Sequence, residues 1–198
     1  MTIQTFPTEV KIAYPVRMRD NWRVLLSVSE GGVEQRISKW TRPIREIDLE
    51  CSLLDRSTEA DTLANFLRAR KGMFESFLFI LPYLRTFNGE WVATGNGTDR
   101  TWRLPFKNAA FYTAYINGVE QYQGPDYDLL FNAGVGGSDI IVFRVVPTAG
   151  QVVTIDAFDA TYIPVVRLAE AYEDEYMYYN RFNSRVKLIE VKDEVSPY

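Results

Sequence analysis

The sequence predicts a mainly β fold with one α-helix. Short runs that alternate apolar and polar residues recur along the chain, and clusters of Gly, Pro, Asn and Asp separate them. Aromatic residues make up 14% of the 198 positions, which suits pleated and half-buried strands. Helical spacing with a start and a stop signal occurs in one stretch, at about 58–71. We therefore expect a β-sandwich or barrel-like domain that holds this helix, with an inserted antiparallel β module.

The expected outer domain comprises residues 1–87 and 161–198, and the module comprises residues 88–160. This division follows from a change of character after Pro82, where short strands begin to alternate with turn clusters. Strands of the outer domain are expected at residues 10–16, 22–28, 34–40, 45–53, 76–81 and 182–191. Strands of the module are expected near residues 90–93, 100–105, 112–117, 140–146 and 151–158.

The strand at 45–53 and the helix after it carry the clearest local pattern. Ser57 or Thr58 can cap the helix, and Thr58 with Asp61 approximates a capping box. Gly72 can adopt the left-handed conformation that ends a helix. Apolar residues on one face of the strand are Ile47, Leu49, Cys51 and Leu53, and those on one face of the helix are Ala60, Leu63, Ala64 and Leu67.

Turn signals divide the rest of the chain. Asn117-Gly118 predicts a two-residue hairpin turn, and Asn88-Gly89 predicts another turn. The acidic residues 170–174 suit a turn or a short helix. The next residues, 175–182, gather three Tyr, one Met and one Phe, and this segment leads into the closing strand.

Composition excludes several classes of site. The chain has no His and one Cys, so it cannot form a Ser-His-Asp triad, a zinc cluster or an internal disulfide. Cys51 is expected to be a small buried hydrophobe. The net charge of −4 does not suit a general nucleic-acid binder, and no apolar run is long enough to insert into a membrane. We expect no catalytic residue, no cofactor and no metal.

Carboxylate-rich segments leave alternatives open. Asp126 and Asp128 could act as a pair of acids in glycoside hydrolysis, or they could belong to a polar turn after Pro125. The glycine-rich residues 134–139 resemble one copy of a calcium-binding repeat, but a loop between strands is the simpler interpretation. The acidic run from Glu170 could bind a cation, or it could be a solvated loop.

Aromatic and basic side chains mark the candidate interface. Trp, Tyr, Met and Arg are enriched where proteins meet, although the same aromatic residues could instead fill the core under a closing strand. The candidate interface residues are Trp40, Arg42, Arg68, Arg70, Tyr176, Tyr178, Tyr179 and Arg181.

The order of several short motifs resembles a known family. Trp40-x-Arg42-Pro43, a strand, a helix ending at 66–72, Phe77-x-Phe79 and Pro164-Val165-Val166-Arg167 follow one another as in the distal tail proteins of long-tailed phages and gene transfer agents. The chain departs from that family at residues 81–84, where relatives tend to carry an Asp-Pro-x-Asp-Tyr stretch.

This resemblance implies a structural protein of a virion, made in the cytoplasm of a bacterial host. Such proteins form a ring, usually a homo-hexamer, which joins the tail tube protein to the hub and tip proteins. In such a protein the turn-rich composition of the module at 88–160 suggests that it projects outward and contacts fibres, tip proteins or a host receptor. One alternative is a minor tail-tip protein that stays monomeric until assembly. Another is a carbohydrate-binding β module, suggested by Trp91 and Trp102.

Overall fold

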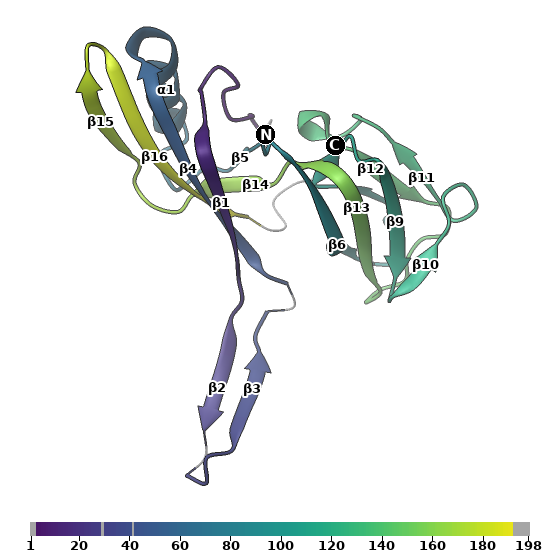
Figure 1. The fold of residues 1–198 in the computed structure, drawn as a ribbon. Coiled ribbons are helices and arrows are strands. Elements are labelled where there is room, and N and C mark those ends of the chain that lie inside the picture. The colour runs from purple at the N-terminus through teal and green to yellow at the C-terminus, as the bar shows by residue number, and fades with distance from the viewer. Residues whose placement is uncertain (1–2, 29, 41, 192–198) are drawn as a thin grey trace. The chain divides into compact units, whose positions relative to one another are not determined.

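The computed structural model describes residues 3–28, 30–40 and 42–191, and it confirms the mainly β fold. Several antiparallel sheets make up most of this part of the chain, and it contains one α-helix (Figure 1). Its residues divide into two compact units, one of residues 3–6 and 77–165 and the other of residues 7–76 and 166–191. We call the first the sandwich unit and the second the helix unit. Residues 192–198, the last part of the expected outer domain, lie outside the described residues.

The helix unit is built on one antiparallel sheet. Strands β1 (Ala13–Asn21), β4 (Ile44–Asp55) and β16 (Arg181–Glu190) lie side by side in that order. Two shorter strands, β14 (Val165–Leu168) and β15 (Glu173–Tyr178), both pair with β16, but at different points along it. The predicted strand at 10–16 therefore begins and ends later in the chain, and the predicted turn or helix at 170–174 overlaps strand β15.

The two faces of this sheet differ because β4 alternates between buried and half-buried residues from Arg45 to Ser52. Ile47, Leu49 and Cys51 are buried, whereas the acidic residues between them lie on the opposite face. Helix α1 (Asp61–Ala69) contributes Leu63 and Leu67 to the buried side. The expected apolar faces of the strand and the helix are thus confirmed for these residues.

The helix starts earlier than predicted. A π-helical turn, η1 (Arg56–Ala60), links β4 directly to α1, so Thr58 lies within helical structure and not at its cap. No side chain caps α1 at Ala60, which means that the predicted capping box of Thr58 and Asp61 is wrong. The left-handed conformation predicted for Gly72 is confirmed, with a φ of +65°, but Lys71 before it already has a φ of 52° and α1 ends at Ala69, two residues earlier than predicted.

An arm extends the helix unit between β1 and β4. It consists of β2 (Val24–Val28) and β3 (Glu34–Ser38), which pair with each other in a two-stranded ribbon (Figure 1). All ten residues of these two strands are exposed. The arm is therefore held by local pairing and buries none of its side chains within the described part of the chain.

The sandwich unit contains two sheets. One has the order β10 (Val119–Gln121), β9 (Phe111–Ile116), β13 (Val152–Tyr162) and β6 (Leu84–Thr94), and β8 (Phe106–Lys107) also pairs with β13. The other has the order β11 (Tyr127–Leu130), β12 (Ile140–Phe143) and β7 (Thr101–Arg103). The short strand β5 (Phe77–Leu78) and the 3-10 turn η2 (Val135–Gly137) complete the unit. Aromatic side chains fill the core: Phe87, Phe106 and Tyr162 form one group, and Tyr127 and Phe143 another.

Turn chemistry explains one confirmed and one wrong prediction in this unit. Asn117 and Gly118 both have positive φ, at 50° and 77°, and connect β9 to β10 as a two-residue hairpin turn. Asn88-Gly89 lies inside β6 instead of at a turn, where the Gly89 N–H donates to the Asp156 carboxylate at 2.6 Å. The pairing of β6 with β13 extends from residues 84 and 161 to residues 94 and 152, beyond the expected module limits of 88 and 160.

Candidate interaction surfaces

Apolar side chains cover both faces of the arm. Leu25 pairs with Ile37 on one face, and Val24 and Leu26 lie on the other. These four side chains are 46–60% exposed. A lone two-stranded ribbon is marginally stable in water, and exposed apolar side chains on both faces favour burial against another surface. The run Val24-Leu25-Leu26 is the sequence signal for this feature, because a half-buried strand would alternate.

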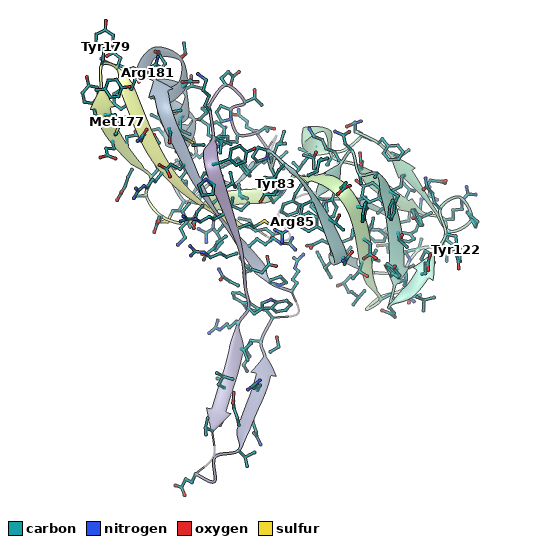
Figure 2. All side chains as sticks on the ribbon, viewed as in Figure 1. Tyr83, Arg85, Tyr122, Met177, Tyr179 and Arg181 are labelled. Atoms are coloured by element: carbon teal, nitrogen blue, oxygen red, sulfur yellow. The ribbon has the colours of Figure 1, made fainter. Side chains whose placement is uncertain are left out.

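Four of the candidate interface residues come together on a second hairpin. Strands β15 and β16 are joined at Tyr179 and Asn180, whose φ angles of 36° and 59° suit a tight hairpin turn. Tyr176, Tyr178 and Tyr179 are 61%, 62% and 87% exposed. Figure 2 shows Tyr179, Met177 and Arg181 at this end of the hairpin. The alternative that these aromatic residues fill the core is therefore wrong for the three tyrosines.

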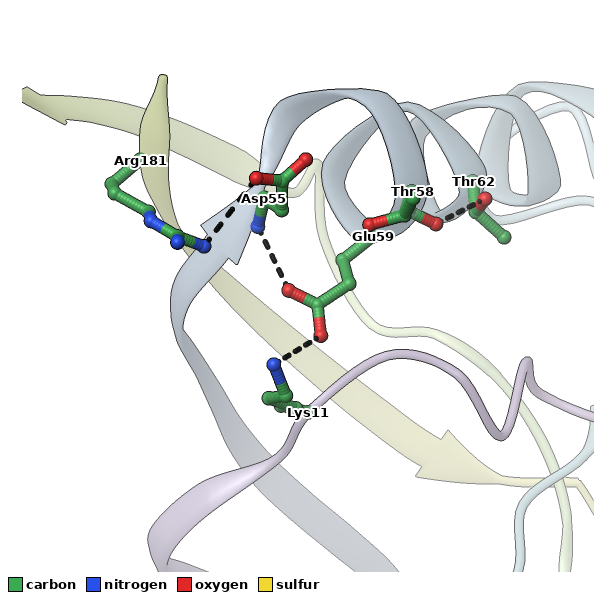
Figure 3. Close-up of polar contacts among 6 residues, drawn as sticks. All are labelled: Lys11, Asp55, Thr58, Glu59, Thr62 and Arg181. Atoms are coloured by element: carbon green, nitrogen blue, oxygen red, sulfur yellow. Dashed lines mark hydrogen bonds and ion pairs between the residues drawn. The ribbon is translucent and has the colours of Figure 1, made fainter. Parts of the chain in front are cut away.

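The turn end of this hairpin is tied to the helical segment that follows β4. Arg181 forms an ion pair with Asp55 at 3.5 Å, and the Asp55 backbone N–H donates to the Glu59 carboxylate at 2.8 Å (Figure 3). Lys11 reaches the other oxygen of Glu59 at 3.0 Å. Burial acts to raise the pKa of Glu59, but the Asp55 hydrogen bond and the Lys11 ammonium outweigh it, so the pKa lies below its ordinary value.

We predict that Glu59→Gln lowers the free energy of unfolding by about 1 kcal/mol at pH 7. Because the folded-state pKa is lowered, the carboxylate stabilises the fold above its unfolded-state pKa, and this stabilisation is lost as pH falls through the folded-state pKa. Urea unfolding at several pH values should show the gap between variant and wild type closing below about pH 4. Glu34→Gln, which removes only an exposed contact to Arg36 in the arm, is the matched control. A gap that is the same at pH 3 and pH 7 would contradict this assignment.

The other candidates lie elsewhere in the helix unit. Trp40 and Arg42 are half-buried between β3 and β4, and the Trp40 carbonyl accepts a hydrogen bond from Ser38 at 2.7 Å. Arg68 is exposed on α1, whereas Arg70 is half-buried, lies over the Phe66 ring at 4.9 Å and pairs with Glu75 at 3.3 Å. These four residues do not belong to the hairpin cluster.

Charged side chains occupy the face of the helix-unit sheet opposite its core. Arg19 of β1 pairs with Asp48 of β4 at 3.1 Å, and Lys187 of β16 lies 3.8 Å from Glu46 of β4. A groove runs over this face, with Arg17, Arg19, Asp48, Glu50, Arg185 and Lys187 among its lining residues. Its mixture of both signs suits a protein surface better than a single charged ligand.

The carboxylates proposed for catalysis have structural partners. Asp126 accepts a hydrogen bond from the Tyr122 N–H at 2.8 Å across a turn, and Asp128 forms an exposed ion pair with Arg144 at 3.3 Å. Within the described residues, no group of three His, Cys, Asp or Glu side chains could hold a metal ion. Cys51 is fully buried, and burial raises the pKa of its thiol to about 12, which keeps it protonated.

Two further observations bear on the alternatives. Trp91 lies in β6 and Trp102 in β7, so the tryptophans that suggested carbohydrate binding belong to different sheets, and both are half-buried. Trp102 packs edge-on against Phe143 at 5.7 Å. Over residues 3–28, 30–40 and 42–191, no helix is both long and apolar enough to cross a membrane.

Comparison with known proteins identified no relative of this chain. No protein-family model matches the chain, and no curated protein matches it in sequence.

Proposed function

We propose that this chain is a structural subunit of a phage or prophage tail. In this proposal it forms a ring, most simply a homo-hexamer, at the distal end of the tail tube and connects the tube protein to the hub and tip proteins. The observation that carries the proposal is the arm, whose strands expose apolar side chains on both faces. In a larger assembly, a neighbouring subunit can bury the apolar side chains of such an arm.

The exposed hairpin at β15 and β16 supports the same proposal. Its tyrosines, Met177 and Arg181 are of the residue types that dominate protein interfaces. The order of the motifs from Trp40 to Arg167 supports a tail protein in particular. A structural subunit requires no catalytic group, cofactor or nucleic-acid contact, so the proposal needs nothing beyond these surfaces.

The sandwich unit has a separate role in this proposal. Its two sheets enclose their own aromatic core, so the unit can present its loops to fibres, tip proteins or a host receptor. A minor tail-tip protein that stays monomeric until assembly remains the second candidate. The exposed arm favours it equally, and the mass of the purified protein separates the two.

Immunogold electron microscopy tests the location. Antibodies raised against the purified chain should label virions, from a host that produces the chain, at the tail end away from the capsid. Label on the capsid, or virions that carry no label while the purified chain is labelled on the same grid, would overturn the proposal.

A further inference from the structure

Two strands of the helix-unit sheet, β1 and β15, each have one side without a strand partner among the described residues. Among the described residues, β1 pairs with β4 alone and β15 pairs with β16 alone. All six residues of β15 are exposed, and Figure 1 shows β1 and β15 on opposite sides of this sheet. An edge strand presents unpaired backbone N–H and C=O groups, which favour the addition of another strand.

Charges on the solvent face of this sheet alternate in sign from strand to strand. The register places Arg17 opposite Asp48, and it places Arg185 opposite both Glu50 and Glu173, so these side chains share one face. On this face the charged side chains are positive on β1, negative on β4, positive on β16 and negative on β15. The residues that make this pattern are Arg17 and Arg19, then Glu46, Asp48 and Glu50, then Arg185 and Lys187, then Glu173 and Glu175.

The outermost charges lack partners within the helix unit. Arg19 and Lys187 form ion pairs with carboxylates of β4. Arg17 at one edge, and Glu173 and Glu175 at the other, form no ion pair with any described residue. The two edges therefore carry unneutralised charges of opposite sign on the same face of the sheet.

Strand directions complete the match. Neighbouring strands from β1 to β15 alternate in direction, so β1 and β15 run in opposite directions. When a second copy continues the sheet in the same orientation, its β1 meets the first copy's β15 in an antiparallel pair. The negative side chains of β15 then lie beside the positive side chains of the next copy's β1, so no two neighbouring strands carry the same charge.

We propose that β15 of one copy pairs with β1 of a second copy, with Glu173 opposite Arg19 and Glu175 opposite Arg17. On the other face this register places the exposed Tyr176 opposite Val16, so an aromatic side chain packs against an aliphatic one. The contact joins two different surfaces, so each copy can take up a neighbour on both sides, and rotation between copies closes a ring. This inference rests on the proposed ring and names the surfaces that build it.

Association of identical edges is disfavoured by the same charges. Two β15 strands would bring Glu173 and Glu175 against one another, and two β1 strands would do the same with Arg17 and Arg19. Complementary edges on one chain therefore favour a second copy, in head-to-tail order, over a symmetric dimer.

Reversed charges test the pairing. Glu175→Lys places a positive side chain opposite Arg17 of the neighbouring copy, and Arg17→Glu places a negative side chain opposite Glu175, so each variant creates one like-charge pair. Each variant alone should need at least about tenfold higher protein concentration to assemble, as measured by light scattering. An equimolar mixture of the two, and the double variant R17E/E175K, should regain the assembly of the wild type. Glu120→Lys, which makes the same charge change at an exposed site in the sandwich unit, is the control and should assemble normally.

The outcomes separate this pairing from the tail location. If the single variants assemble as the wild type does, the pairing of β15 with β1 is wrong. It is also wrong if neither the mixture nor the double variant regains assembly. Either result would still allow a ring built from other contacts. A wild-type chain that is monomeric at every concentration also overturns pairing between copies. The immunogold label decides the tail location independently of all three results.

Discussion

Removal of the arm is expected to abolish assembly without unfolding the protein. Replacing residues 24–38 with a four-residue Gly-Ser linker deletes β2 and β3, which pair only with each other among the described residues. The last pair of the β1–β4 ladder, Asn21 with Ile44, lies close enough to the cut to be closed by such a linker. We expect circular dichroism and the melting temperature to stay near those of the wild type, since no core residue is lost.

The loss of assembly should be large. Covering four half-exposed Val, Leu and Ile side chains stabilises an interface by about 1 kcal/mol each, so their removal should weaken association about 1,000-fold. The double variant L25S/I37S removes two of them from one face and should weaken association about 30-fold. S27A/Q35A changes polar neighbours on that same face and is the matched control. An arm-deleted protein that assembles at wild-type concentrations would exclude the arm from the interface.

Asp139→Ala is expected to destabilise the sandwich unit strongly, although it removes no apolar side chain from the core. Asp139 is fully buried, and its carboxylate accepts hydrogen bonds from the Tyr112 hydroxyl at 2.6 Å and the Asn132 N–H at 2.8 Å. Truncation leaves both donors without this acceptor, at about 1–3 kcal/mol each. The free energy of unfolding should fall by about 3–4 kcal/mol, which lowers the melting temperature by about 10 °C or more.

The control for this change is Asp128→Ala. Asp128 lies in the same unit, but its side chain is 54% exposed and pairs only with Arg144 at the surface. Removal of such an ion pair costs at most about 1 kcal/mol. Urea unfolding of both variants should separate them clearly, and equal stabilities would show that the buried carboxylate contributes no more than the exposed one.

A second polar contact of the core involves Ser138, the residue before Asp139. Next to it, Ser138 accepts a hydrogen bond from the Arg103 guanidinium at 2.9 Å, and Arg103 also donates to the Ile163 carbonyl at 2.7 Å. Burial lowers the pKa of Arg103 to about 10, which still leaves it charged at neutral pH. Buried polar groups of this kind are stable only when partners satisfy them.

Local patterns in the sequence predicted the elements that local physics controls. Alternation in β4 reflects one buried and one charged face, and Asn117-Gly118 adopts the positive φ angles that its residue types favour. Asn88-Gly89 has the same turn residues and Gly89 keeps a positive φ of 62°, yet it forms an irregularity within β6, because pairing with β13 continues on both sides of it and its N–H donates to Asp156. Propensity alone cannot reveal such long-range pairing.

The candidate surface was predicted only in part, for a related reason. Residues 175–182 stand out by composition, and the structure places Tyr176, Tyr178, Tyr179 and Arg181 on one hairpin. Strand β15 itself was missed because its acidic residues resemble a turn, and acidic residues have low strand propensity. The relation between β15 and β1 depends on strand order, which joins residues about 155 positions apart and leaves no local signal.

The mass of the purified protein in solution, measured by light scattering across a concentration series, tests the central claim most directly. The account predicts a closed assembly of defined mass, most simply a hexamer of the 22.8 kDa chain, which persists on dilution. A protein that remains monomeric at every concentration would contradict the self-assembling ring and favour the tail-tip protein that assembles only on its partners.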